Sequence, residues 1–190
     1  TEPEPIQPEP TEPEPIAIPF LPFMPDPIVE TQNTLGNNDY TTWGTWTISQ
    51  GNEILDYNHW ISGDTTASDD LPGTGTVTYN GSVHGSVYDA GYREIDGTSS
   101  VTANFSDNTM SGTLHMKYQD SGSSFVQAHL NDTTITRASS SFSGELVNGA
   151  TITDGTISGK FYGPNAEEIG GDWELTKDGN RATGIFNGKQ

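Results

Sequence analysis

The stretch GKFYGPNAEEIGGDWEL at residues 159–175 interrupts a strand-like pattern with a break, a short polar run and a double glycine. Pro164 fixes the backbone angle with which a helix begins, and Glu167-Glu168 would stand near the positive end of one helical turn. Gly170-Gly171 is expected to supply φ values that other residues resist, so that the chain returns to a strand. The stretch predicts a β-hairpin whose connection contains one turn of helix and caps one end of a β-core.

The sequence around this hairpin has the period of antiparallel strands. From Tyr40 onward apolar and polar residues alternate, and turn signals recur about every 8–12 residues. The Asn-Gly dipeptides at 80–81 and 148–149 predict two-residue hairpin turns. Glycines recur on the expected inward face, where they allow the curvature of a small barrel: Gly75, Gly85, Gly112, Gly144, Gly159 and Gly184. We predict an all-β protein, with an antiparallel β-barrel of about eight strands at residues 74–190 and a smaller β element at 34–73.

Residues 1–33 differ from the rest of the chain. TEPEPI occurs at residues 1–6 and again at 11–16, and proline at nearly every second position favours an extended polyproline conformation. Residues 16–29 are apolar, which a free spacer does not need, and this part of the tail is expected to dock. It packs either on its own domain or in a groove of a neighbouring subunit. Its leading side chains are Ile16, Ile18, Phe20, Leu21, Phe23 and Met24.

Composition and charge restrict the classes of partner. The net charge is −19, from 26 acidic and 7 basic residues, so nucleic acid would find no basic footprint. A basic partner surface or divalent cations would be attracted instead. The chain has no cysteine, which excludes disulfides and thiolate metal sites. No apolar run approaches the roughly 20 residues of a membrane helix, and no signal peptide is visible at the start.

No pattern of catalytic residues is present. The sequence lacks a nucleophile elbow, a phosphate loop, a His-Glu-x-x-His motif and an EF-hand, so no enzyme and no cofactor is predicted. Of the histidines, His84 and His115 alternate with apolar neighbours and are expected to point outward from the barrel wall. His59 and His129 complete the set, in which a haem ligand is the alternative to exposed or hydrogen-bonded side chains.

One loop is acidic enough to suggest calcium. Asp64, Asp69 and Asp70 lie together with Thr and Ser residues, and carboxylate and hydroxyl oxygens are ligands that Ca²⁺ accepts. A solvated acidic loop is the alternative, because aspartate is mostly exposed in proteins. The three aspartates are therefore a weak calcium candidate.

Aromatic residues are concentrated just after the tail. Tyr40, Trp43, Trp46, Tyr57 and Trp60 lie within a short part of the 34–73 element. Such a density indicates either a local core against the barrel or a recognition surface for a partner. If the module binds a protein, we expect contacts here, in the loop at 62–73 and in the apolar part of the tail.

The hairpin stretch and the C-terminal strand resemble the closing hairpin of the transferrin-binding protein B barrel family. The matching residues lie in 161–171 and 184–189 and are Phe161, Tyr162, Gly163, Pro164, Ala166, Glu168, Gly170, Gly171, Gly184, Phe186 and Lys189. Segments 75–87 and 101–114 are similar to the family's first barrel strands, whereas 34–74 resembles its handle domain only loosely. The chain departs from the family's pattern in having no cysteine for a lipid anchor and room for one barrel instead of two lobes.

The resemblance implies a non-enzymatic β-barrel module on the outer surface of a Gram-negative bacterium or outside the cell, which binds another macromolecule. Family members bind unrelated partners through variable loops and the handle, so transferrin is not carried over. A structural subunit of a surface layer or filament, with the tail docked on a neighbouring copy, is the first alternative. Binding of haem or another small ligand is the second, and the Val, Ile, Leu, Phe and Met residues that fill the barrel argue against it.

Overall fold

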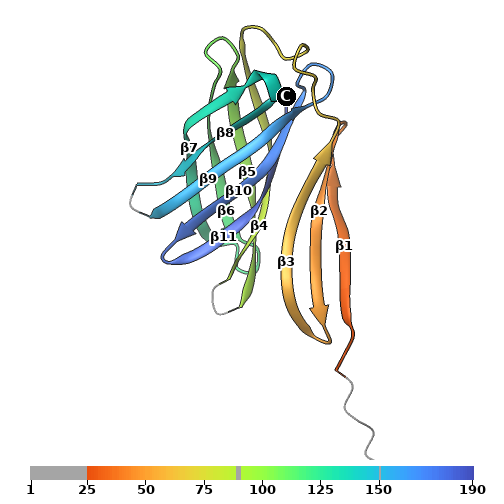
Figure 1. The fold of residues 1–190 in the computed structure, drawn as a ribbon. Coiled ribbons are helices and arrows are strands. Elements are labelled where there is room, and N and C mark those ends of the chain that lie inside the picture. The colour runs from red at the N-terminus through yellow and green to blue at the C-terminus, as the bar shows by residue number, and fades with distance from the viewer. Residues whose placement is uncertain (1–24, 89–90, 150) are drawn as a thin grey trace, which may run out of the picture.

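A computed structural model describes residues 25–88, 91–149 and 151–190. It consists almost entirely of antiparallel strands in two sheets, shown in Figure 1. None of the helices in these described ranges has the length and apolar character needed to cross a membrane. The all-β prediction is confirmed.

The N-terminal sheet, here called the handle, has three strands. They are β1 (Ile28–Asn37), β2 (Thr41–Gln50) and β3 (Glu53–Gly63), in the order β1-β2-β3. β3 lies next to the barrel and β1 lies on the far side (Figure 1). β1 begins at Ile28, so the last six residues of the segment 1–33, which the sequence pattern assigns to the tail, belong to this strand. Ile28 and Val29 are 66% and 47% exposed in this strand, so neither docks on the described part of the chain.

The second sheet closes into a barrel of eight strands in the order β10-β11-β4-β5-β6-β7-β8-β9. Its elements are β4 (Thr76–Tyr88), β5 (Tyr92–Asn104), β6 (Thr109–Tyr118), β7 (Ser124–Thr136), the short 3₁₀ helix η1 (Arg137–Ser139), β8 (Ser141–Val147), β9 (Ile152–Tyr162), β10 (Glu168–Lys177) and β11 (Asn180–Lys189). The last strand pairs with the first, from Lys189 opposite Asn80 to Ala182 opposite Val87. The closed barrel of eight strands is as predicted.

The barrel interior is a packed core. Large side chains from all around the wall and from the turn after β5 are almost fully buried, among them Tyr79, Phe105, Phe142, Phe161, Trp173 and Phe186. An eight-stranded barrel is just wide enough for side chains to fill it. The interior therefore stabilises the fold, and its buried aromatic groups occupy the space that a carrier protein would reserve for a ligand.

Glycine on the inward face makes room for the largest core side chain. Trp173 on β10 lies opposite Gly184 on β11, which in turn lies opposite Gly85 on β4. A Cβ at Gly85 would be 2.2 Å from a ring carbon of Trp173, and one at Gly184 would be 2.8 Å from it. The indole lies across both positions and donates a hydrogen bond of 3.1 Å to the Ile185 carbonyl.

Two local predictions are wrong. The connection between β9 and β10 is a turn and not a turn of helix, because Ala166 has a φ of 59° and the Glu167 carboxylate accepts hydrogen bonds from Asn165 N and Nδ2 at 2.8 and 2.9 Å. Gly170-Gly171 lies inside β10, and neither residue has positive φ. The two glycines instead permit close approach, since a Cβ at Gly170 would meet Ile61 of β3 at 2.3 Å.

The first Asn-Gly dipeptide is also not a turn. Residues 80–81 lie in the middle of β4, opposite Ser100 and Ser99 of β5. A Cβ at Gly81 would lie 2.2 Å from the Asn187 carbonyl oxygen of β11, so glycine is needed there for the approach of another strand. At the second dipeptide a turn is present, since Gly149 has a φ of 48° and Thr151 N donates to the Asn148 carbonyl. The connection from Val147 of β8 to Ile152 of β9 has four residues, however, and not the two that were predicted.

Candidate functional site at the handle–barrel junction

The handle is attached to the barrel by a buried carboxylate. Glu168, the first residue of β10, is 1% exposed. Its Oε1 accepts hydrogen bonds from the backbone nitrogens of Asp39 and Tyr40 at 2.8 and 3.1 Å, and its Oε2 accepts one of 2.7 Å from Thr41 Oγ1. A buried carboxylate needs such donors, because its desolvation is otherwise costly. Glu168 therefore fixes the start of β2 against the closing hairpin of the barrel.

The end of β3 is joined to the same hairpin. Thr65 forms an isolated antiparallel bridge with Tyr162, in which Thr66 N donates to Phe161 O and Gly163 N donates to Asp64 O, both at 2.9 Å. The Thr66 hydroxyl adds a hydrogen bond of 2.6 Å to Gly163 O. Beyond this bridge β3 and β9 diverge, which opens a space between them.

The face of the handle directed at the barrel is defined by the strand register. Trp43, His59 and Ile61 lie on it, and the Trp43 ring stacks 6.5 Å from His84 of β4. Burial lowers the pKa of His59 to about 4, and the nearby His84 contributes to this shift. Burial also lowers the pKa of His84, which points outward from the barrel as predicted but is covered by the handle. Neutral histidines are therefore favoured in this interface.

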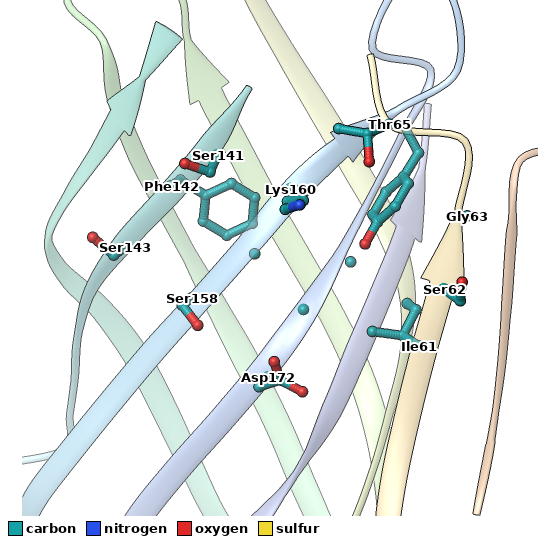
Figure 2. Close-up of a pocket in the computed structure, with 14 residues that line it drawn as sticks. Ile61, Ser62, Gly63, Thr65, Ser141, Phe142, Ser143, Ser158, Lys160 and Asp172 are labelled. Carbon is teal, nitrogen blue, oxygen red and sulfur yellow. The ribbon is translucent and has the colours of Figure 1, made fainter. Parts of the chain in front are cut away.

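A groove lies between β3 and the outer wall of β8, β9 and β10; we call it the β3 groove. Its main part has a volume of about 530 Å³. Figure 2 shows Ile61 and Ser62 of β3 on one side, Ser141 and Ser143 of β8 on the other, and Lys160 between them. A second part, of about 330 Å³, continues along β3 past Asn58 and His59. Both parts share Ser158 and Asp172, so the groove follows β3 from residue 58 to residue 63.

The charges in the groove are not neutralised by the described residues. Asp172 is open to solvent within the groove (Figure 2), and no described side chain forms an ion pair or hydrogen bond with it. The surrounding protein still removes part of the water from the Asp172 carboxyl, and this partial burial raises its pKa. Lys160 likewise forms no salt bridge within the part of the chain that the structure describes. An unpaired carboxylate and an unpaired ammonium group are thus available to a ligand in one groove.

A second feature of the junction is a tyrosine cluster at the β4–β5 end of the handle interface. Tyr57 of β3 donates a hydrogen bond of 2.9 Å to the Glu94 carboxylate, and its ring lies 6.3 Å from that of Tyr92. Burial, followed by the effect of Glu94, raises the pKa of Tyr57. Tyr88 stacks edge-on against Tyr92 at 5.4 Å, and these two side chains are 63% and 41% exposed. Exposed tyrosines of this kind are frequent at protein interfaces.

The structure divides the predicted aromatic cluster between two faces. Trp43 and Tyr57 face the barrel, and the Tyr40 ring lies against Gly163, where a Cβ would be 2.7 Å from it. Trp46 and Trp60 lie on the outer face of the handle. Trp46 donates its indole N–H to Glu30, and Trp60 donates to the Thr45 carbonyl at 3.2 Å. Contact of any of these residues with a partner stays a prediction.

Other predicted site residues are placed as follows. The apolar tail residues Ile16, Ile18, Phe20, Leu21, Phe23 and Met24 lie outside the described residues. His115 and His129 are exposed, and His129 hydrogen-bonds with Thr113. In residues 25–88, 91–149 and 151–190 no three histidine or acidic side chains gather to hold a metal ion, so Asp64, Asp69 and Asp70 form no such group.

Sequence pattern missed the roles of two acids. Glu168 matches the family motif but was expected to cap a helical turn, and its partners lie more than 120 residues earlier in the chain. Asp172 alternates with the buried Trp173 in β10, which places it outside the barrel. Asp172 lines a groove only because β3 lies opposite it, and the position of β3 cannot be read from sequence spacing.

Comparisons with a family model and with a curated relative both identify transferrin-binding protein B as similar to this chain. Residues 71–190 match the family described as the C-lobe and N-lobe beta barrels of Tf-binding protein B. Transferrin-binding protein B of Neisseria meningitidis serogroup B is 27% identical in an alignment of 156 positions, which covers 70% of this chain and 22% of that protein. The chain thus spans about a fifth of the length of this curated relative.

Solved structures are similar in fold. A mutant of transferrin-binding protein B from Haemophilus parasuis Hp5 has a TM-score of 0.63 at 20% identity, over 85% of this chain and 37% of that one. The N-lobe domain of lactoferrin binding protein B from Moraxella bovis has a TM-score of 0.56 at 16% identity, over 87% of this chain and 80% of that one. The second match shows that the handle and barrel together correspond to about one lobe.

Proposed function

The chain belongs to the family of C-lobe and N-lobe beta barrels of Tf-binding protein B, and on that premise we propose that it is a non-enzymatic, protein-binding module of a Gram-negative bacterial surface protein. The filled barrel interior is the observation that carries the proposal. Because aromatic side chains occupy the inside of the barrel, binding is left to the outer surface. The handle–barrel junction is where unpaired charges and exposed tyrosines gather on that surface.

The names of the relatives suggest the first partners to test. They bind transferrin in one case and lactoferrin in the other. We would immobilise the chain and titrate it with purified transferrin and, separately, lactoferrin. Tyr92→Ser in the tyrosine cluster should weaken binding about tenfold, since tyrosine is enriched among the few interface residues whose truncation costs more than about 1 kcal/mol.

Val147→Thr is a matched control for this variant, because Val147 is 37% exposed on β8 and takes no part in the tyrosine cluster. Binding that survives in the control and falls in Tyr92→Ser supports the junction as the contact surface. Equal affinities in both variants would contradict this placement. No binding of either protein would contradict the transfer of the relatives' partners to this chain.

A structural subunit is a second candidate, and the outer strand of the handle favours it. β1 pairs with β2 alone among the described strands and exposes Ile28, Val29 and Leu35, of which Leu35 is 50% exposed. The unpaired backbone groups of an edge strand are a template for pairing with another copy, and these three apolar side chains would be covered by it. Light scattering of the full chain and of residues 25–190 tests this. The shorter chain lacks most of the Pro-rich tail but keeps the whole of β1. Large assemblies of the full chain would favour the subunit, and monomers at both lengths would contradict it.

A further inference from the structure

The edge of β3 that faces the barrel is an unpaired strand edge. Among the described strands β3 pairs with β2 only, and its register places Thr41 opposite Gly63. Asp64 N donates to the Tyr40 carbonyl at 3.1 Å, so the ladder to β2 runs through the backbone groups of the even-numbered residues. The backbone groups of His59, Ile61 and Gly63 therefore point to the opposite side, along the β3 groove.

The groove has the size and the floor that an added strand needs. Its two parts, of about 530 and 330 Å³, each fall within the range of about 300–1,000 Å³ typical of ligand sites. Gly159, Gly170 and Gly171 line its wall without side chains. An extended segment beside β3 would thus find few protruding groups on β9 and β10.

The charges in the groove select among occupants. Asp172 forms no ion pair with any described residue, and it lies on the wall that faces the unpaired edge. A strand added to β3 directs alternate side chains at this wall. An arginine or lysine at one of those positions can form the charge-assisted hydrogen bonds that Asp172 lacks.

A second copy of the chain is a poor source of that cation. The chain has only seven basic residues. Four of them form ion pairs with the chain's own acids: Arg93, Lys117, Lys177 and Arg181. Arg137 donates to the carbonyls of Pro72 and Leu71. The remaining two, Lys160 and Lys189, lie in β9 and β11, which are paired on both sides within the closed barrel and so cannot join β3 as an added strand. The basic group is therefore better supplied by a different protein.

We propose that the β3 groove receives an extended segment of a partner protein as a fourth strand of the handle, with an arginine or lysine side chain at Asp172. This inference rests on the proposed protein-binding function and states the chemistry of the partner. Backbone hydrogen bonds to the β3 edge supply affinity, and the carboxylate selects the side chain.

Synthetic peptides test the proposal directly. The probe is a blocked heptapeptide of alternating threonine and valine with a central arginine, added to the isotope-labelled full chain while its amide NMR signals are recorded. Signals of Ile61, Gly63, Gly170 and Asp172 should shift together. A peptide with central glutamate should bind at least about tenfold more weakly, because it brings a like charge to Asp172.

Two further peptides test strand pairing itself. One carries N-methyl groups on its odd residues and the other on its even residues. Only alternate amides of an added strand face β3, so one pattern should abolish binding and the other should retain it. Equal effects of both patterns would overturn the strand geometry.

Two variants of the chain test the charge. Asp172→Asn should remove the preference for arginine over glutamate, whereas Lys160→Gln, the matched change on the same wall, should retain it. An unchanged preference in Asp172→Asn, or peptide shifts confined to residues outside the groove, would overturn the proposal. A chain that binds transferrin or lactoferrin but no peptide would overturn this inference alone, while the protein-binding function would stand.

Discussion

Replacing Glu168 should release the handle and leave the barrel folded. The carboxylate is buried and accepts two backbone and one hydroxyl hydrogen bond from the start of β2. In Glu168→Gln the amide oxygen can keep the two backbone donors, and the Thr41 hydroxyl can rotate to accept from the amide nitrogen. The loss is then the difference between charged and neutral acceptors, about 1 kcal/mol for each backbone bond and about 2 kcal/mol in total.

Glu168→Ala has a larger expected effect. It leaves three donors without an acceptor in a buried place, and each such group costs about 1–3 kcal/mol. We expect a loss of about 4 kcal/mol in the docking of the handle, compared with about 2 kcal/mol for Glu168→Gln. Glu53→Gln is the control, because it removes the same charge from an exposed position on β3.

Amide hydrogen exchange distinguishes the handle from the barrel, since local units open with their own free energies. In Glu168→Gln the protected amides of β2 and β3 should exchange about 30-fold faster, which corresponds to about 2 kcal/mol. The amides of β6, across the barrel, should change little. If β6 loses protection as strongly as β2, handle and barrel unfold as one unit and the reasoning is refuted. Unchanged exchange in β2 would refute the role of the carboxylate.

Three further outcomes are expected. Burial lowers the pKa of His59 to about 4, so the unfolded chain binds the proton more tightly than the folded chain. About 3 kcal/mol of stability should therefore be lost as the pH falls from about 6.5 to about 4. Thermal unfolding across this range should show a flatter pH profile for His59→Gln than for the native chain. Gly170→Val should displace Ile61, because even a Cβ would lie 2.3 Å from its Cδ1, and handle amides should lose protection while barrel amides keep theirs. Tyr79→Phe should cost about 1 kcal/mol in denaturant unfolding, since it removes one buried hydrogen bond of 2.7 Å to the Ala166 carbonyl; a loss above 3 kcal/mol would show that more than this bond is broken.

The barrel could be predicted from sequence because its signals are local and repeated. Alternation fixes which side of each strand is buried, and the glycines opposite Trp173 lie where the sequence expects small residues on the inward face. A turn was wrongly predicted at residues 80–81, because glycine after asparagine can serve either a hairpin turn or a close contact between strands, and the sequence is the same in both cases. Only the nearby Asn187 carbonyl oxygen, 2.2 Å from where a Cβ at Gly81 would lie and from a strand about 100 residues later, distinguishes the two cases.

The junction could not be predicted, because it combines segments that sequence spacing does not relate. The β3 groove brings Ile61, Ser158 and Asp172 together from three strands of two sheets. The aromatic cluster was identified, but its division between two faces depends on the register of β2 with β3. The turn at 163–167 was misjudged because the left-handed backbone of Ala166 is stabilised by its tertiary setting, where Tyr79 and Gln190 both donate to its carbonyl.

Closure of the barrel by its first and last strands has a consequence for the order in which the protein matures. β4 can pair with β5, the next strand, but its other edge has no partner until β11 is available. Contacts between residues so distant in sequence form slowly, because the chain loses the entropy of a long loop before the contact contributes any stabilisation. When the chain emerges from its N-terminus, the barrel strands therefore form an open sheet, and the free edge of β4 stays unpaired until β11 is present. The three strands of the handle follow one another in sequence, so the handle can complete its pairing without any later segment.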